Sequence, residues 1–338
     1  MNRFRESPDP SHKRAQLMNP LRATPEDVRH AYRLLLGREP DPQGRASYLK
    51  HISEHPVNAT DIAAIFLSSG EFRSRQAAIS VCDEIAFEGL KLYPWRGDSL
   101  IGDLIKSTGE YEAYMLPLFV DSVPVGGTVL DVGANIGVYA LSAARKAGVQ
   151  GRVFAVEPVP ENVHSLCMGV VGNGFTNVSI LPVAASAAPG VVPMLRNKNS
   201  SNGIVDTYAD PVSVEAFVPA QRLDFLLAGL DRLDVIKIDI EGHEPVAWPS
   251  IEVLVRKHRP IVFTEFNPVA IRNHACMLPE DYLGGLFGTG GRVTALHVDG
   301  RRVPCDTPRE VMEQWREANR RMNAVDTHHL DLVLDVSA

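Results

Sequence analysis

The chain has 338 residues, of which 45% are hydrophobic and 22% are charged, and its formal net charge is −7. These values are typical of a globular protein whose apolar core needs neither disulfides nor a structural metal. The acidic balance disfavours a nucleic-acid partner, since such partners usually require a basic surface. The four cysteines lie far apart and form no metal-binding or redox motif.

The N-terminal stretch is polar and rich in proline, and we expect a disordered tail over residues 1–23. It lacks the apolar centre of a signal peptide. No later stretch reaches the roughly 20 apolar residues of a membrane helix. The sequence therefore predicts no membrane span and a cytoplasmic location.

Residues 24–80 have the pattern of a small all-α domain. Thr24 is placed to cap a helix that begins at Pro25. The segments LLLGREPDPQG (34–44) and FLSSGEF (66–72) resemble a small helical domain of unknown function. That domain is found attached to bacterial surface-layer proteins, glycan enzymes and phycobilisome-linker-like proteins. The resemblance implies docking to a protein or glycan assembly, and the alternative is a mere helical cap on the rest of the chain.

We expect residues 81–123 to be a helical linker. Beyond it, short β-branched runs alternate with helical segments, which is typical of a doubly wound, mostly parallel sheet. One α/β domain is therefore predicted over 124–338. The predicted strands span 128–132, 152–156, 178–181, 235–238 and 261–264, and the predicted helices span 137–146, 161–171 and 245–257.

The segment VLDVGANIG (129–137) predicts a strand, a glycine turn and a helix. We expect Gly133 to let the backbone approach a ligand, and Gly137 to let the helix pack closely on the strand. Unpaired N–H groups in the first helical turn suit a ligand carboxylate. The G-x-x-x-G spacing disfavours a nicotinamide dinucleotide, which requires G-x-G-x-x-G.

The next two strands add candidate cofactor contacts. Glu157 follows the second strand, and its carboxylate can accept hydrogen bonds from both hydroxyls of a ribose. Small residues after the third strand leave room for an adenine ring. The predicted cofactor-binding residues are Asp131, Gly133, Asn135, Gly137, Glu157 and Ala184.

The segment KIDIEGHE (237–244) gathers charged residues at the end of a buried strand. Burying Asp239 alone would cost roughly 3 kcal/mol or more, so Lys237, a metal or helix amides must partner it. Glu265 and Asn267 follow the next strand, and they should lie beside Asp239 if the two strands pair.

The glycine turn, Glu157-Pro158, the Arg222-Leu223-Asp224 element and the segment 237–244 together resemble the FkbM family of methyltransferases. Tyr111-Glu112 fits the same pattern. The resemblance covers residues 108–270. It implies the Rossmann-like fold of class I methyltransferases, S-adenosylmethionine as cofactor, and O-methylation of a hydroxyl on a sugar, glycan or polyketide-type acceptor.

For such a reaction we expect Glu241 or His243 to remove the proton of the hydroxyl, while Asp239 orients the acceptor or holds a cation. Glu265 and Asn267 are the predicted substrate contacts. The spacing of Asp239 and Glu241 also loosely resembles a D-x-D element of metal-dependent sugar O-methyltransferases. A Mg²⁺ ion held by Asp239 and Glu265 is therefore an alternative.

Two other functions compete with this interpretation. A non-catalytic scaffold or docking protein would carry a degenerate cofactor fold, but the intact glycines and acids argue against degeneracy. An RNA ribose methyltransferase would need a basic groove, which is not visible. The D/N-P-P-Y/F element that is common in N-methylation of bases is missing from residues 239–242.

Overall fold

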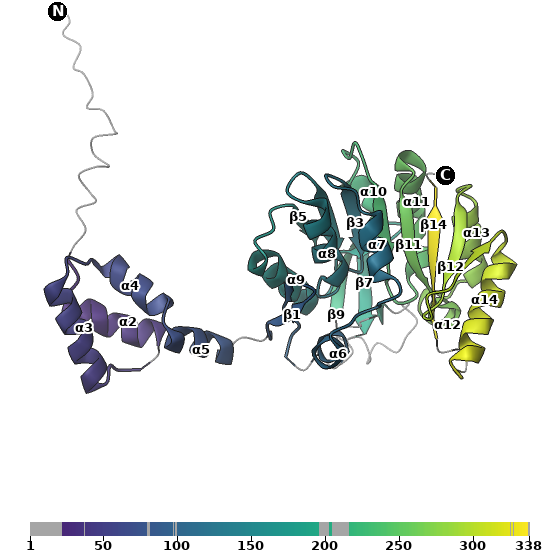
Figure 1. Ribbon diagram of the computed structural model, residues 1–338. Coiled ribbons are helices and arrows are strands. Elements are labelled where there is room, and N and C mark those ends of the chain that lie inside the picture. Colours follow the sequence, from purple (N-terminus) through teal and green to yellow (C-terminus); the bar gives the residue numbers. More distant parts are fainter. Residues whose placement is uncertain are drawn as a thin grey trace, which may run out of the picture. The chain divides into compact units, whose positions relative to one another are not determined.

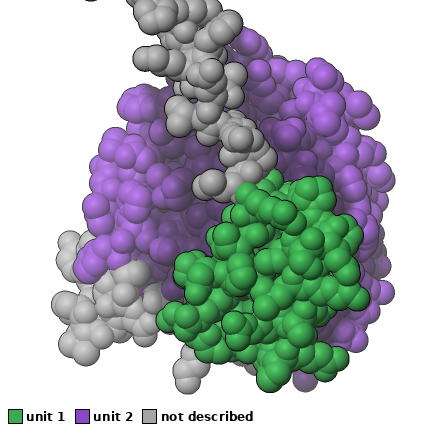
Figure 2. Space-filling model, turned by 90° about the vertical axis from the view of Figure 1, so that its left-hand side faces the viewer, with its two compact units in different colours: residues 1–81 green, residues 82–338 purple. Residues whose placement is uncertain are grey.

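The computed structural model describes residues 22–36, 38–79, 82–96, 98, 100–195, 203–204, 216–324, 326 and 328–336. The chain divides into two compact units, Met1–Val81 and Cys82–Ala338 (Figures 1 and 2). The tail expected over 1–23 lies outside the described residues, except for Arg22 and Ala23. Ala23 is buried and donates a backbone hydrogen bond to Val57, so it is part of the helical unit. None of the helices in the described part of the chain combines the length and the apolar character that a membrane crossing requires.

The first unit is built from short, well-capped helices. Thr24 and Asn58 each accept a hydrogen bond from the backbone three residues ahead, and this fixes where two of the helices begin. The rings of Tyr32, Tyr48 and Phe66 contact one another in the core. The helices are α2 (Pro25–Leu35), α3 (Pro42–Glu54), α4 (Ala59–Leu67) and α5 (Gly70–Ile79).

The helical linker expected over 81–123 is wrong, because from Cys82 onward this stretch is part of the second unit. Strands β1 (Ile85–Phe87) and β2 (Leu90–Leu92) form an antiparallel hairpin, and α6 (Ile101–Thr108) and α7 (Leu116–Ser122) follow. The side chains of Phe87, Leu92 and Phe119 are buried in the same cluster as α8. Burial of these apolar residues ties the stretch to the α/β domain.

An eight-stranded sheet forms the centre of the second unit, as far as the chain is described, in the order β13-β12-β14-β11-β10-β3-β4-β5. Five neighbouring strands, from β11 to β5, are parallel, and β14 runs antiparallel to both β11 and β12. The predicted doubly wound, mostly parallel fold is confirmed. The strands are β3 (Thr128–Val132), β4 (Arg152–Val156), β5 (Val178–Leu181), β10 (Val235–Ile238), β11 (Ile261–Phe266), β12 (Arg292–Leu296), β13 (Arg302–Cys305) and β14 (Leu330–Asp335).

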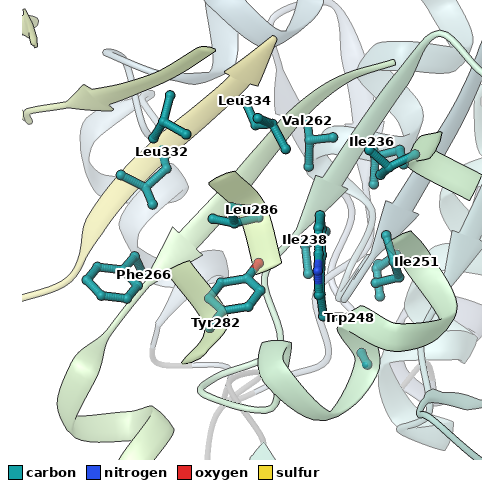
Figure 3. Packing of buried hydrophobic residues seen from close by; sticks show 14 of the residues in the cluster. Ile236, Ile238, Trp248, Ile251, Val262, Phe266, Tyr282, Leu286, Leu332 and Leu334 are labelled. Carbon is teal, nitrogen blue, oxygen red and sulfur yellow. The ribbon is translucent and has the colours of Figure 1, made fainter. Parts of the chain in front are cut away.

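Helices cover both faces of this sheet (Figure 1). Alternate strand residues point to opposite faces, so Val235 and Phe263 pack toward α8, whereas Ile236 and Val262 pack toward α11 and α13 (Figure 3). Each face therefore has its own apolar core. The helices are α8 (Val138–Ala147), α9 (Pro160–Gly172), α10 (Leu223–Leu226), α11 (Glu244–His258), α12 (Pro268–Ala270), a π-helical turn (Ile271–Ala275), α13 (Pro279–Phe287) and α14 (Pro308–Arg321).

A second, smaller sheet was not expected from the sequence. It has the order β6-β9-β7-β8, with β6 (Ala184–Ala185), β7 (Gly190–Leu195), β8 (Gly203–Ile204) and β9 (Ala216–Gln221). Its strands are short, and Pro193 and Pro219 interrupt the apolar pattern that would mark them. Buried Ala184 and Met194 belong to the small core of this sheet and also line the cavity described next.

Candidate active site

A cavity of about 480 Å³ lies at the carboxyl ends of β3, β4, β10 and β11. This is where open α/β sheets bind ligands. We call two parts of its lining the glycine-turn side (Gly133, Ala134, Asn135, Glu157 and Pro158) and the acidic side (Glu112, Lys237, Asp239, Glu241 and Glu265). These residues come from segments more than 150 positions apart, and the sheet brings them together.

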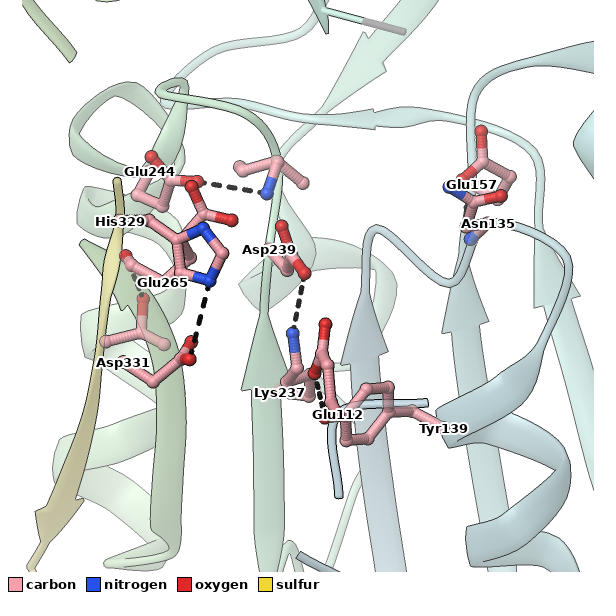
Figure 4. A network of polar contacts seen from close by, with 12 residues as sticks. Glu112, Asn135, Tyr139, Glu157, Lys237, Asp239, Glu244, Glu265, His329 and Asp331 are labelled. Carbon is pink, nitrogen blue, oxygen red and sulfur yellow. Dashed lines mark hydrogen bonds and ion pairs between the residues drawn. The ribbon is translucent and has the colours of Figure 1, made fainter. Parts of the chain in front are cut away.

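The N–H groups of the glycine turn are used inside the protein. Those of Gly133 and Ala134 both donate to the carbonyl oxygen of Val156, at 2.9 and 3.0 Å. That of Asn135 donates to Glu157 Oε2 at 2.8 Å (Figure 4). The turn is thereby attached to the end of β4. The first turn of α8, where we expected a ligand carboxylate, begins only at Val138, so that expectation stays a prediction.

A side chain at either glycine would overlap a neighbouring part of the chain. A Cβ atom on Gly133 (φ +89°) would lie 1.8 Å from the carbonyl oxygen of Asp239, and one on Gly137 (φ +99°) would lie 2.5 Å from Leu166 Cδ1. Gly133 therefore makes room for the backbone at the end of β10, and it also lines the cavity, so its approach to a ligand stays a prediction. Gly137 makes room for α9 rather than for close packing of α8 on its strand.

Two buried acids flank this turn. Glu157 is 4% exposed, and its Oε1 accepts a further hydrogen bond from the Val159 N–H at 2.9 Å. Asp131 is 1% exposed, and its Oδ2 accepts no hydrogen bond from the described residues. Burial raises the pKa of each to about 7, although Lys237 lowers that of Asp131 and backbone N–H groups lower that of Glu157.

The acidic side is a row of charged residues on one face of the sheet. Lys237 pairs with Asp131 across β10 and β3, and Glu265 pairs with Asp331 across β11 and β14, so these four side chains point to the same face. Lys237 Nζ lies 2.8 Å from Asp239 Oδ2 and 4.6 Å from the ring centre of Tyr139 (Figure 4). The partner that Asp239 was expected to need is therefore Lys237.

Charges on this side depend on one another. Burial works against the charge of Lys237, but Asp239 and other acids outweigh it and raise the pKa of the lysine. Burial also works against the charge of Asp239, but Lys237 and a hydrogen bond from Glu265 lower the pKa of this aspartate. Burial and neighbouring Asp239 raise the pKa of Glu265 well above its usual range. These shifts favour the proton on Glu265, which shares a hydrogen bond with Asp239.

Glu112 is a site residue to which the sequence reasoning gave no role. It lies between α6 and α7 with a φ of +40°, and Tyr139 donates a hydrogen bond to its Oε2. Burial raises its pKa, while Lys237 opposes this effect. Tyr111 and His329 line the same cavity. Tyr111-Glu112 was visible as part of the family pattern, but nothing in the sequence located it beside β10.

The segment after β10 is held by a tight turn. Gly242 has a φ of +91°, and a Cβ atom there would lie 2.4 Å from the backbone of Ala270. Glu244 Oε1 accepts hydrogen bonds from the N–H groups of Ile240 and Gly242 at 3.0 and 3.3 Å. Glu244 is therefore a structural acid at the start of α11.

This turn separates the predicted catalytic residues. Glu241 lines the cavity, and its φ of +56° is rare for a residue with a side chain. The expected role of His243 is wrong, because this residue is 6% exposed at the start of α11 and lies outside the cavity lining. Ala184 and Asn267 do line the cavity. However, Asn267 Oδ1 is engaged in capping α12, where it accepts from the Ala270 N–H at 3.1 Å.

The predicted Mg²⁺ site does not fit the structure. Among the described residues, no group of three or more histidine, cysteine or acidic side chains is arranged to hold a metal ion. Asp239 is paired with the ammonium group of Lys237, and burial and neighbouring Asp239 raise the pKa of Glu265 well above its usual range. Magnesium prefers ionised carboxylates with open coordination positions. Neither candidate ligand offers this.

Comparisons with known proteins agree with the motifs. Residues 131–281 match the family described as "Methyltransferase FkbM domain". The protein-L-isoaspartate O-methyltransferase of Methanococcoides burtonii is 32% identical over 27% of this chain and 54% of that protein. The methyltransferase sdnD of Sordaria araneosa is 25% identical over 48% of this chain and 75% of that protein. The chain thus spans about half the length of the first of these relatives and three quarters of the second.

Among solved structures, the methyltransferase FkbM of Methylobacillus flagellatus is similar with a TM-score of 0.32 and 15% identity. The similarity covers 70% of this chain and 47% of that one. The glycine turn, Glu157 and the segment 237–244 all lie within the part of the chain that matches the family. Residues 131–281 are therefore similar to the methyltransferase FkbM domain.

Proposed function

We propose that the chain is an S-adenosylmethionine-dependent methyltransferase that methylates a hydroxyl oxygen. The observation that carries this proposal is the cavity itself, in which the glycine turn and Glu157 of an FkbM domain face a charged cluster at the ends of β10 and β11. A methyltransferase needs both parts, since the cofactor and the acceptor must be held against each other.

The glycine-turn side fits this cofactor. Asp131 is buried outside the cavity lining, so its contact with the cofactor stays a prediction. Glu157 accepts two backbone N–H groups and, at 3.5 Å, the side-chain amide of Asn162, yet a carboxylate has about four acceptor positions, so it retains capacity for a ribose hydroxyl. Ala184 lines the cavity as a small residue beside which an adenine ring fits.

When bound, this cofactor supplies a methyl group on a positively charged sulfur. The protein then has to orient the acceptor, exclude water and accept the hydroxyl proton. We assign proton removal to Glu241, which lines the cavity on the acidic side. Asp239, kept ionised by Lys237, orients the hydroxyl, and Glu265 and Asn267 contact the acceptor.

The acceptor that this cavity supports is a neutral small molecule or glycan, of sugar or polyketide type. The acidic side has four acids and one lysine, which disfavours phosphate-bearing RNA. Leu100 and Leu104 add apolar surface to the lining and are 45% and 44% exposed. The docking role of the helical unit stays a prediction.

The first test is calorimetry of the full chain with S-adenosylmethionine and, in parallel, with NADH. We expect only the former to bind, and Glu157→Gln to weaken binding by about tenfold through loss of an acceptor for the ribose. Binding of NADH alone would contradict the proposal.

The second test measures the transfer of a labelled methyl group from S-adenosylmethionine to a panel of methyl glycosides and phenols. We expect Glu241→Gln to lower the rate by about 100-fold or more, without changing cofactor affinity. Equal rates for Glu241→Gln and the parent chain would remove Glu241 from the mechanism.

A further inference from the structure

We propose that the acceptor is an oligosaccharide, and that a second cavity beside the first binds the sugar unit next to the one that is methylated. This second cavity, which we call the β14 cavity, has a volume of about 340 Å³ and lies where β12 ends and β14 begins. Such a volume is within the range of small-molecule sites. The proposal rests on the proposed function and adds to it the length of the acceptor. The lining includes Leu296, Val298, Arg321, His328, His329 and Asp331.

Both cavities lie along the same edge of the large sheet. Strand β14 is antiparallel to β11 and to β12, so β14 begins, and β12 ends, at the edge where β10 and β11 end. The strand order then places the glycine-turn side at β3 and β4, the acidic side at β10 and β11, and the β14 cavity beyond them. An acceptor whose hydroxyl lies at the acidic side can therefore extend away from the cofactor into the β14 cavity.

The linings of the two cavities meet at His329, which belongs to both. In addition, Glu265 lines the first cavity and Asp331 lines the second, and these two residues are direct partners on β11 and β14. Neighbouring strands lie about 5 Å apart. The side chain of His329 is 35% exposed, and its Nε2 lies 3.7 Å from Asp331 Oδ2 (Figure 4). The cavities are thus immediate neighbours, and a ligand of two sugar units can reach both.

The boundary between the cavities carries a pair of rings that the fold holds in place. The buried side chains of Trp315 and Asn319 donate to the carbonyl oxygen of His328 at 2.8 and 3.0 Å. The N–H of His328 in turn donates to Asn319 Oδ1 at 3.0 Å. Its imidazole lines the β14 cavity and stacks on that of His329, with the ring centres 5.2 Å apart. The backbone of His328 is therefore fixed by α14, while its ring faces the ligand space.

The charges of the β14 cavity are already paired, which disfavours an anionic ligand. Among the described residues of its lining, Arg321 is the one arginine or lysine, and it contacts Asp299 at 3.3 Å and Glu317 at 2.8 Å. Asp331 accepts a hydrogen bond from Tyr114. A phosphate or carboxylate group would need a cation that is available to pair with it. A neutral ligand fits this lining better.

Imidazole rings and apolar side chains supply the remaining contacts, and both suit a sugar. Burial and neighbouring His329 lower the pKa of His328, so its ring is neutral at neutral pH and has one donor and one acceptor. A hydroxyl group is likewise both a donor and an acceptor. Leu296, Val298 and Met322 add apolar surface. A sugar ring has hydroxyl groups at its rim and C–H groups on its faces, so each kind of surface finds a partner here.

The experiment compares methyl transfer by the full chain to matched acceptors at saturating S-adenosylmethionine. The probes are the methyl glycosides of glucose, galactose, mannose and rhamnose, and methyl glycosides of disaccharides that contain the same sugars. We expect at least one disaccharide to have a kcat/KM about tenfold or more above that of its monosaccharide. The gain should come mainly from a lower KM, because the second sugar binds away from the reacting atoms.

Two variants assign this preference to the β14 cavity. His328→Ala removes the ring but keeps the backbone groups that α14 holds, and the preference for the disaccharide should fall to about twofold or less. Met322→Trp enlarges an exposed side chain of the lining and should have the same effect by filling the cavity. His164→Ala is the matched control. It removes an exposed histidine outside both linings and should keep the full preference.

The outcomes separate this proposal from the proposed function. If monosaccharides or phenols are methylated and no disaccharide is preferred, the second sugar site is wrong and the proposed function stands. If a disaccharide is preferred but both variants retain the preference, the second sugar binds elsewhere and the β14 cavity is not its site. If no glycoside or phenol accepts a labelled methyl group, the proposed function fails together with the second site.

Discussion

The two sides of the cavity keep buried acids by different means. On the glycine-turn side, both oxygens of Glu157 accept backbone N–H groups that the fold itself holds in place. On the acidic side, Asp239 depends on the side chains of Lys237 and Glu265. Backbone partners persist when a side chain is replaced, whereas side-chain partners do not. A substitution on the glycine-turn side should therefore affect only its immediate neighbours. A substitution on the acidic side should also change the pKa values and contacts of the other charged residues there.

The largest effect should come from Lys237→Met, which removes the cation from the acidic side. Asp239, whose side chain is 24% exposed, would then lack its ion-pair partner, and we expect the free energy of unfolding to fall by about 3 kcal/mol or more at pH 7. Urea unfolding followed by tryptophan fluorescence measures this change. The signal reports the second unit, since Trp95, Trp248 and Trp315 all lie in it.

The double variant Lys237→Met/Asp239→Asn distinguishes a charge effect from lost packing. Removing both charges should restore more than half of the lost stability. The single variant should also recover partly at pH 5, because Asp239 can then take up a proton. A double variant as unstable as the single one would mean that Lys237 stabilises the fold mainly through its contact with Tyr139.

On the glycine-turn side, Gly133→Ala is the sharpest local test. The new Cβ atom would lie 1.8 Å from the carbonyl oxygen of Asp239, at a φ of +89°. We expect the free energy of unfolding to fall by about 3 kcal/mol or more, because backbone strain and steric overlap add together. Gly174→Ala is the matched control, because Gly174 has a φ of +67° but nothing within 4 Å. Gly174→Ala should lower the free energy of unfolding by only about 1 kcal/mol. If both variants lower it equally, the close contact of Gly133 with the end of β10 does not matter for stability.

The same contrast explains what could be predicted from the sequence. Strands β3, β4, β5 and β10 were placed at their observed bounds, because each is a short β-branched run followed by a turn or helix signal. Such signals are local, and so Glu157 and Asp239 could be identified at strand ends. Glu112 and Asp331 could not, since they reach the site only through the packing of α6, α7 and β14.

Two errors have the same origin. His243 follows Glu241 by two positions, but the left-handed turn at Gly242 takes it out of the cavity. Backbone direction in a turn depends on contacts such as that between Gly242 and Ala270, which the sequence does not reveal. The expected linker over 81–123 failed because the packing of β1, β2, α6 and α7 on the α8 side of the unit is a tertiary property.

A smaller effect is expected for Glu157→Gln, and it should depend on pH. Burial raises the pKa of Glu157 from 4.5 to about 7, so the folded state favours the protonated form. This contribution to stability is complete below pH 4.5 and is lost as the pH rises through 7. Glutamine carries no charge, so the variant should gain about 2–3 kcal/mol relative to the parent between pH 5 and pH 8. Urea unfolding of both proteins measures this difference. If the difference in free energy of unfolding between variant and parent is the same at pH 5 and at pH 8, the raised pKa of Glu157 is contradicted.

The smallest effect should be that of magnesium on the parent chain. Lys237 already partners Asp239, so EDTA or millimolar MgCl₂ should shift the melting temperature by less than about 1 °C. The Lys237→Met variant sharpens this test. With the ammonium group removed, the negative charge of Asp239 beside Glu241 is unbalanced, and Mg²⁺ should raise the melting temperature of the variant by about 2–4 °C. Stabilisation of the parent chain by Mg²⁺ would instead mean that the metal displaces Lys237 from Asp239. The acidic side would then not depend on Lys237 in the way that its contacts indicate.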